Sequence, residues 1–248
     1  MSKNNRNILL TRPKDKSDEL AKVLAPIADH IDITPLFNYR QGPQFSILSD
    51  QLKQLSPDFV IFISPASVRF ASQHFDSNEE MQRCFSKFKI ITVGTATKLV
   101  LQEYLAQPIT VPTTHNSEGI LALPEFQQVE QKSILIIRGN GGRELLKQEL
   151  QHRGAIVAYN EVYERNWLSL NKSQTIEKWR KDNINFIVIT SGELFDKTLS
   201  YIDDMNWANR CTWIVASKRI AEQAKACGLT KVINAEGASH QQILKAID

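Results

Sequence analysis

The stretch Ser133–Arg165 reads SILIIRGNGGRELLKQELQHRGAIVAYNEVYER, and the fold can be worked out from it. Its apolar run Ile134–Ile137 has the length and β-branched character of a buried parallel strand. The sequence RGNGG follows at 138–142, where the chain can turn sharply and side chains leave the backbone N–H groups uncovered. Residues 143–152 predict a helix that ends before the next glycine, and a second strand begins near Ile156. The stretch therefore predicts a strand–loop–helix–strand unit whose loop attracts negative charge.

The glycine loop matches the dinucleotide fingerprint G-x-G-x-x-G only in part, because Glu144 stands where the third glycine is required. A carboxylate- or phosphate-binding turn is therefore favoured over an NAD or FAD site. A turn without any ligand is a further alternative.

Strands and helices are expected to alternate through the rest of the chain, which is typical of parallel α/β sheets. The expected extended segments are Ile8–Leu10, Ile31–Tyr39, Phe59–Ile63, Ile90–Val93, Ile109–Val111, Phe186–Ile189, Trp213–Val215 and Val232–Asn234. The expected helices include Asp15–Ala28, Ile47–Leu55, Ser117–Leu123, Ser173–Lys181 and Ser239–Ile247, and Gln41–Ser46 is expected to be a loop.

The chain also repeats itself at about half its length. ILLTRPKDKSDELAKVL aligns with ILIIRGNGGRELLKQEL, which places Arg12 over Arg138. At the same offset, Ser64 corresponds to Thr190. A duplication with this period predicts two similar α/β halves, with ligand recognition between them.

Composition narrows the function. The chain has 248 residues, a formal net charge of +3 and 42% hydrophobic residues. This mild charge suits an acidic small molecule, and no cluster of Lys and Arg with aromatics indicates nucleic-acid binding. The polar N-terminus MSKNNRN predicts no signal peptide, and no apolar run approaches the ~18 residues of a membrane span. We expect a cytoplasmic protein.

Metal and redox cofactors are not expected. The five histidines are scattered without H-x-x-H spacing, and the three cysteines show no C-x-x-C spacing. The cysteines are predicted to be reduced, mostly structural thiols.

Small or polar residues follow six predicted strands, at the point where a helix begins. Ligands bind outside the carboxyl ends of the strands in open α/β sheets, and helix N-termini there attract anions. Arg12 and Arg138 can add a bidentate fork for a carboxylate. Any single Ser or Thr is more often a helix cap, but the repetition in both halves favours binding. The candidate residues are Thr11, Ser64, Gly94, Thr95, 139–142, Thr190, Ser191 and Ser217.

Several of these segments resemble those of one known family. They are Leu10-Thr11-Arg12-Pro13, Phe62-Ile63-Ser64-Pro65, Val93-Gly94-Thr95-Ala96-Thr97, RGNGGRELLKQEL, Val162-Tyr163, Ile189-Thr190-Ser191, and the tail from Val215-Ala216-Ser217 to Ala238-Ser239. In their order and spacing across essentially all 248 residues, the chain resembles the uroporphyrinogen-III synthase family of tetrapyrrole biosynthesis.

The resemblance implies two similar parallel-sheet α/β domains joined by two extended linkers, with a cleft between them. One domain would combine residues 1–35 with 167–248, and the other would be the insert 41–161. Residues 33–40 and 160–166 would be the linkers, and the protein is expected to be a monomer.

The implied reaction is the cyclisation of linear hydroxymethylbilane to uroporphyrinogen III, with loss of water and inversion of the terminal pyrrole ring. By resemblance, Tyr163 matches the tyrosine placed in the cleft and is the candidate proton donor for the leaving hydroxyl. Ser64, Thr97 and Ser191 match polar cleft positions. The glycine-containing loop is matched by Arg138-Gly139-Asn140. The resemblance implies no cofactor.

Two alternatives remain. A non-enzymatic two-domain binder of acidic small molecules would share the fold and the loops but would return its ligand unchanged. A nucleotide-dependent enzyme would need the complete glycine fingerprint.

Overall fold

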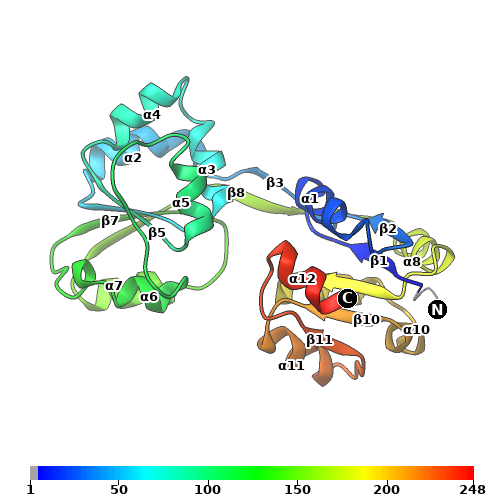
Figure 1. Cartoon of the computed structure of the whole chain (residues 1–248). Coiled ribbons are helices and arrows are strands. Elements are labelled where there is room, and N and C mark those ends of the chain that lie inside the picture. The colour runs from blue at the N-terminus through cyan, green and yellow to red at the C-terminus, as the bar shows by residue number, and fades with distance from the viewer. Residues whose placement is uncertain (1–4) are drawn as a thin grey trace. The chain divides into compact units, whose positions relative to one another are not determined.

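The computed structural model describes residues 5–248, so the first four residues of the N-terminal stretch MSKNNRN lie outside the described range. The chain forms two compact units (Figure 1). The split unit comprises Met1–Asn38 and Asn166–Asp248, and the continuous unit comprises Tyr39–Arg165. Two strands, β3 (Phe37–Gln41) and β8 (Ile156–Trp167), run across the boundaries between them.

Residues 39–165, all of them described, contain a sheet with the strand order β3-β8-β7-β4-β5-β6. Its other strands are β4 (Phe59–Phe62), β5 (Lys89–Thr92), β6 (Ile109–Thr110) and β7 (Ser133–Gly139). The pairs β7–β8, β4–β7, β4–β5 and β5–β6 are parallel, as the apolar strands predict. Their carboxyl ends therefore meet at one edge of the sheet.

Helices cover both faces of this sheet (Figure 1). Because side chains alternate along a strand, Val60 and Phe62 of β4 belong to one core, while Phe59 and Ile61 belong to the other. The first core is closed by α2 (Leu48–Leu55), α3 (Pro65–Ser72), α4 (Asn78–Phe85) and α5 (Thr95–Leu101). The second core is closed by α6 (Ser117–Leu121) and α7 (Leu145–His152). Two short 3-10 turns lie in the same unit, at Phe45–Ile47 and Pro124–Phe126.

The described part of the split unit contains a sheet with the order β11-β10-β9-β1-β2, in which every neighbouring pair is parallel. Its strands are β1 (Asn7–Leu10), β2 (His30–Ile33), β9 (Phe186–Ile189), β10 (Thr212–Val215) and β11 (Val232–Asn234). Ile8 and Leu10 face α1 (Lys14–Leu24) and α12 (His240–Ile247), whose apolar residues share their core. The remaining helices are α8 (Lys172–Lys181), α9 (Gly192–Tyr201), α10 (Met205–Arg210) and α11 (Lys218–Ala226).

The two sheets have equivalent strand orders. The series β2-β1-β9-β10-β11 in the split unit corresponds to β8-β7-β4-β5-β6 in the continuous unit. Each unit therefore combines strands from both copies of the repeat, and the duplication in the sequence is out of phase with the units in space. The expected class, two similar parallel-sheet α/β units, is confirmed.

Several expected boundaries are wrong. Ile31–Tyr39 is not one extended segment but two strands, β2 and β3, on either side of Pro35. The helix expected to reach Ala28 ends at Leu24, two residues before Pro26, which lacks the N–H that a helix interior requires. Two helices were not expected, α4 and α10. Each begins at a capping side chain, Ser77 for α4 and Asp204 for α10.

The expected correspondence of Ser64 with Thr190 is also wrong by one residue. Ser64 caps α3 by accepting a hydrogen bond from the Ser67 backbone N–H, and Ser191 caps α9 in the same way from Leu194. Ser64 is therefore equivalent to Ser191. The alignment shifts by one residue between the first strand–helix unit of each repeat and the second.

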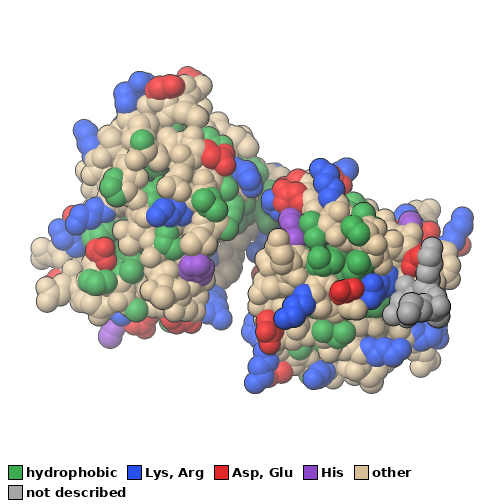
Figure 2. Space-filling model, viewed as in Figure 1, with side chains coloured by type: hydrophobic (Ala, Val, Ile, Leu, Met, Phe, Trp, Pro, Cys, Tyr) green, Lys and Arg blue, Asp and Glu red, His purple; other side chains and the backbone are tan. Residues whose placement is uncertain are grey.

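On the face drawn in Figure 2, acidic and basic side chains are interspersed among neutral ones, in keeping with the mild net charge of +3. Among residues 5–248, no helix combines the length and the apolar character that crossing a bilayer requires. The three cysteines are free thiols, and burial raises the pKa of Cys211 to about 12.

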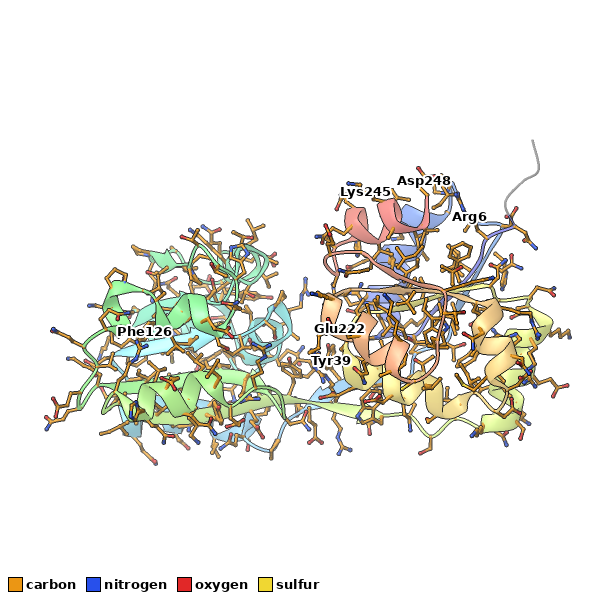
Figure 3. All side chains as sticks on the ribbon, turned by 90° about the horizontal axis from the view of Figure 1, so that it is seen from below. Arg6, Tyr39, Phe126, Glu222, Lys245 and Asp248 are labelled. Carbon is orange, nitrogen blue, oxygen red and sulfur yellow. The ribbon has the colours of Figure 1, made fainter. Side chains whose placement is uncertain are left out.

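The core under α6 and α7 should tolerate little loss of volume. Phe126, labelled in Figure 3, is fully buried and its ring centroid lies 5.0 Å from that of Phe59. We predict that Phe126→Ala lowers the free energy of unfolding by about 3–5 kcal/mol through the cavity it leaves. Leu99→Ala, at a side chain that is 67% exposed, should change it by less than about 0.5 kcal/mol.

Urea unfolding followed by circular dichroism measures both values. Tryptophan fluorescence would not report on this core directly, because the four tryptophans of the chain lie in the split unit. Equal losses in the two variants would contradict the assigned packing.

Candidate active site

A cavity of about 450 Å³ opens in the continuous unit, at the carboxyl ends of β4, β5 and β7. Its size lies within the ~300–1,000 Å³ of small-molecule sites. Apolar side chains form part of its lining, namely Ile63, Val93, Ile136 and Leu146. Polar lining comes from the 139–142 loop, from Asn116 and Ser117 at the start of α6, and from two tyrosines and three arginines.

A register shift at the end of β7 determines how these side chains point. Arg138 pairs with Glu161, but the next residue, Gly139, pairs with Tyr163, so Val162 is the extra residue of a β-bulge. Without the bulge, Tyr163 would point to the same face as Tyr159. With it, Tyr163 joins the core under α2–α5, whereas Tyr159 packs against the core under α6 and α7. Bulges commonly re-aim side chains beside active sites.

Tyr163 is held on all sides. Its hydroxyl lies 3.2 Å from the Ser64 hydroxyl, and its ring packs against Tyr39 and Phe70 with centroid distances of 5.0 and 5.5 Å. The ring also covers Gly139, where an added Cβ would lie 2.3 Å from the Tyr163 ring. Only 8% of Tyr163 is exposed, yet it lines the cavity. Its phenol is therefore positioned as a hydrogen-bond donor or acceptor towards a bound molecule.

Arg138 provides the positive charge in the interior of the cavity. It is 5% exposed, its Nε donates to the Gly139 carbonyl at 3.0 Å, and its Nη1 donates to Glu144 at 3.0 Å. Its guanidinium carbon lies 4.4 Å from the centroid of the Tyr159 ring. Burial and a hydrogen bond donated to Glu144 raise the pKa of Tyr159 to about 12, despite the opposing charge of Arg138. Tyr159 is therefore a neutral donor at any working pH.

The glycine loop is shaped by backbone conformation. Gly141 and Gly142 have φ of +69° and +94°, which favour glycine. Asn140 joins the loop to β8, because its N–H donates to the Tyr163 carbonyl at 2.9 Å and its side-chain oxygen accepts from the Arg165 N–H at 3.0 Å. Two more cavity arginines, Arg143 and Arg165, come from the loop and from β8.

The candidate residues of the continuous unit gather near this cavity to different degrees. Arg138, Gly139, Asn140 and Tyr163 line it, and Ser64 reaches it through the Tyr163 hydroxyl. Gly94 is the N-cap of α5, directly after the lining residue Val93. Thr95 is exposed at the first position of that helix, and Thr97 is 3% exposed.

The remaining candidates belong to the split unit. Ser191 and Ser217 cap α9 and α11, and Thr190 is the residue before Ser191. Thr11 is fully buried, and its hydroxyl has no hydrogen-bond partner among the described residues. Arg12 is half-buried at the end of β1, at the position equivalent to Arg138.

Tyr159, Arg143 and Arg165 were not among the sequence candidates. Tyr159 and Arg165 lie on the strand of Tyr163, but alternation gave no reliable signal for them, because the bulge at Val162 interrupts it. Glu144 was noted only as the residue that breaks the glycine fingerprint. Its contact with Arg138 could not be foreseen, since it depends on how α7 begins.

Possible metal ligands come together at one place among residues 5–248. One ligand atom each from His30, Asp32 and Asp182 lies within 4.8 Å of the others. Lys178 pairs with both carboxylates, so its ammonium group already supplies a positive charge there.

Fold and cavity together define a class of protein: a two-unit α/β protein with an arginine-lined cavity that suits an anionic ligand with apolar parts. The family described as Uroporphyrinogen-III synthase HemD matches residues 5–245. The chain is 33% identical to uroporphyrinogen-III synthase of Escherichia coli (strain K12), with 97% of this chain and 99% of that protein covered. It is 30% identical to the enzyme of that name from Salmonella typhimurium, with the same coverage of 97% and 99%.

Solved structures support the fold. A mutant uroporphyrinogen III synthase from Thermus thermophilus superposes with a TM-score of 0.64 at 13% identity, covering 96% of both chains. The synthetase from Helicobacter pylori gives 0.63 at 14% identity, covering 97% of both. The chain belongs to the uroporphyrinogen-III synthase family. The protein is therefore a cyclising lyase that converts hydroxymethylbilane in tetrapyrrole biosynthesis. The alternative of a non-enzymatic binder is not favoured.

The close approach of Gly139 to Tyr163 gives a test of the site. In Gly139→Ala the new Cβ would fall 2.3 Å from the Tyr163 ring and force it to move. We predict a loss of about 1–3 kcal/mol in stability and, because the phenol is misplaced, a loss of ~10²-fold in turnover.

The matched control is Gly141→Ala, whose added Cβ would meet no atom within 4 Å. Its φ of +69° costs about 1 kcal/mol of backbone strain, but the Tyr163 ring stays in place. Thermal unfolding and turnover of hydroxymethylbilane are measured for both. If Gly141→Ala loses as much turnover as Gly139→Ala, the contact with Tyr163 is not what matters.

Proposed function

We propose that the cavity of the continuous unit is where this chain binds the reacting end of hydroxymethylbilane, and that Tyr163 acts there as the proton donor. One observation carries the proposal. The Tyr163 hydroxyl faces Ser64 at the edge of a cavity that combines apolar walls with Arg138, Arg143 and Arg165. A pyrrole ring with carboxylate arms offers the complementary surface.

Binding would use both kinds of wall. The pyrrole would lie against the apolar and aromatic side chains, while its carboxylates would meet the arginines and the N–H groups of the 139–142 loop. Such binding restricts the orientation of the terminal ring. Because the substrate can also close by itself without inversion, orientation decides which isomer forms.

Chemistry would begin with loss of the hydroxyl as water, for which Tyr163 donates the proton. The Ser64 oxygen is fixed as the N-cap of α3, where it accepts the Ser67 N–H at 3.1 Å, and it would hold the phenol in position. Breaking of the C–O bond leaves an electrophilic methylene carbon on the first pyrrole ring. The substituted carbon of the terminal ring then forms a bond to this methylene carbon, giving a spiro intermediate that leads to the inverted ring.

The split unit would bind further carboxylates of the same substrate. The proposed residues are Thr11, Arg12, Thr190, Ser191 and Ser217, together with Gly94, Thr95 and Thr97 of the continuous unit. Helix N-termini at α9 and α11 support this assignment. We also propose that the protein acts as a cytoplasmic monomer, with domains 1–35 plus 167–248 and 41–161 joined through 33–40 and 160–166. The two compact units support this division.

Tyr163→Phe removes the proposed donor and keeps the ring. General-acid assistance typically contributes ~10²–10⁴-fold, and water can replace part of it, so we predict a turnover loss near the low end. Uncatalysed closure of the substrate then competes with the enzyme reaction. The share of the type I isomer, which is the product of closure without inversion, should therefore rise.

Ser64→Ala and Thr97→Ala are the comparison variants, and both should lose less, because the backbone N–H groups of the same helix starts remain. Turnover and isomer ratio are measured for all three beside the parent. A parent-like Tyr163→Phe together with a collapsed Ser64→Ala would refute the assigned role.

Independence from metals and cofactors is a separate prediction. The scattered histidines and cysteines and the incomplete glycine fingerprint motivate it. Activity should survive exhaustive dialysis against a strong chelator. Activity lost in this way and restored by a metal ion or a nucleotide would show that the prediction is wrong.

A further inference from the structure

The Glu144 carboxylate accepts hydrogen bonds from two of the side chains that line the cavity. Its Oε1 accepts from Arg138 Nη1 at 3.0 Å, and its Oε2 accepts from the Tyr159 hydroxyl at 2.9 Å. One carboxylate is thus bound by a cation and a neutral hydroxyl at once. Arg138 and Tyr159 both line the cavity.

Arg138 is much more deeply buried than the carboxylate that it binds. The Arg138 side chain is 7% exposed, whereas that of Glu144 is 50% exposed. Arg138 is further held by the Gly139 carbonyl at 3.0 Å and lies on the Tyr159 ring. Glu144 precedes the first residue of α7, and within residues 5–248 its side chain forms no hydrogen bond other than these two. It can therefore turn towards solvent while its partners stay in place.

We propose that Arg138 and Tyr159 form a carboxylate subsite for the substrate, and that Glu144 fills it in the free protein as an internal, displaceable substitute. This inference rests on the proposed function, since it names the group that binds one carboxylate arm of the tetrapyrrole. Glu144 is then a specificity residue. It keeps the buried arginine paired when no ligand is present.

Two consequences follow from the geometry. Only a ligand group that satisfies both an ionic and a neutral donor replaces Glu144 without loss, which selects a carboxylate over a neutral amide or an ester. Displacement also weakens binding, because every ligand carboxylate must compete with Glu144. The product therefore dissociates faster than it would from a site in which Arg138 had no internal carboxylate partner.

The test uses uroporphyrinogen III, kept reduced under anaerobic conditions, as the probe of binding. Its Kd is measured by calorimetry, and KM and kcat are measured with hydroxymethylbilane. The variant is Glu144→Gln, which keeps the size and one acceptor but removes the competing charge. The matched control is Glu149→Gln in α7, the helix that Glu144 precedes, which makes the same change in net charge away from Arg138 and Tyr159.

We expect Glu144→Gln to bind the product about three- to tenfold more tightly and to lower KM by a similar factor, with kcat changed less than KM. Glu149→Gln should match the parent. The gain in affinity should disappear in the double variant Glu144→Gln/Arg138→Gln. It should become smaller in the double variant Glu144→Gln/Tyr159→Phe. The tyrosine variant maintains the test if the loss of Arg138 impairs folding.

Several outcomes would overturn the inference. The inference is wrong if Glu144→Gln binds the product with the same Kd as Glu149→Gln, or more weakly. It is also wrong if neither the parent nor Glu144→Gln binds the product. The proposed function is tested separately by the isomer that the parent makes. If the parent makes uroporphyrinogen III and Glu144→Gln leaves the Kd unchanged, the proposed function stands and the proposed subsite is wrong. If the parent makes no uroporphyrinogen III and Glu144→Gln binds it more tightly, the proposed subsite stands and the proposed function is wrong.

Discussion

The bulge at Val162 of β8, opposite the end of β7, is the constraint on which the site depends. It inserts Val162 opposite the step from Arg138 to Gly139 and so turns Tyr163 onto the face of the sheet where Ser64 lies. The extra backbone groups are satisfied from one neighbouring segment, because the Gly42 N–H donates to the Val162 carbonyl at 2.9 Å and the Gln44 side chain accepts from the Glu161 N–H at 2.8 Å. Gly42 itself has no room for a side chain, since an added Cβ would lie 2.0 Å from the Glu161 carbonyl oxygen. Phenol and arginine thereby reach one cavity from opposite faces of the sheet.

Electrostatics and packing divide the work within that cavity. The apolar walls hold a ring by excluding water, which is not directional. Arg138 adds direction, because a nearly buried guanidinium strongly favours an anion at a fixed place. A ligand that carries both rings and carboxylates can use both kinds of wall, and this suits an enzyme whose main task is to orient a substrate that also reacts on its own.

The sequence was informative where one local rule dominates. The apolar run Ile134–Ile137 predicted a buried parallel strand, and the glycines after it predicted a sharp turn; both are present. The N–H groups of this turn were expected to be uncovered, but that of Asn140 donates to the Tyr163 carbonyl. The direction of Tyr163 could not be predicted, because period-2 alternation fails at a bulge that only tertiary hydrogen bonds stabilise. The pairing of Glu144 with Arg138 depends likewise on the exact start of α7. Helix α4 was overlooked because its amphipathic segment is short and strongly polar.

Every role proposed for the site requires that the reacting substrate binds in the cavity beside Tyr163 and Arg138. The structure of the protein in complex with reduced uroporphyrinogen III tests it most directly. We expect a pyrrole ring against Tyr159 and Tyr163, one carboxylate on Arg138, and Glu144 turned away. A product that is bound without contact to any of these residues would contradict it.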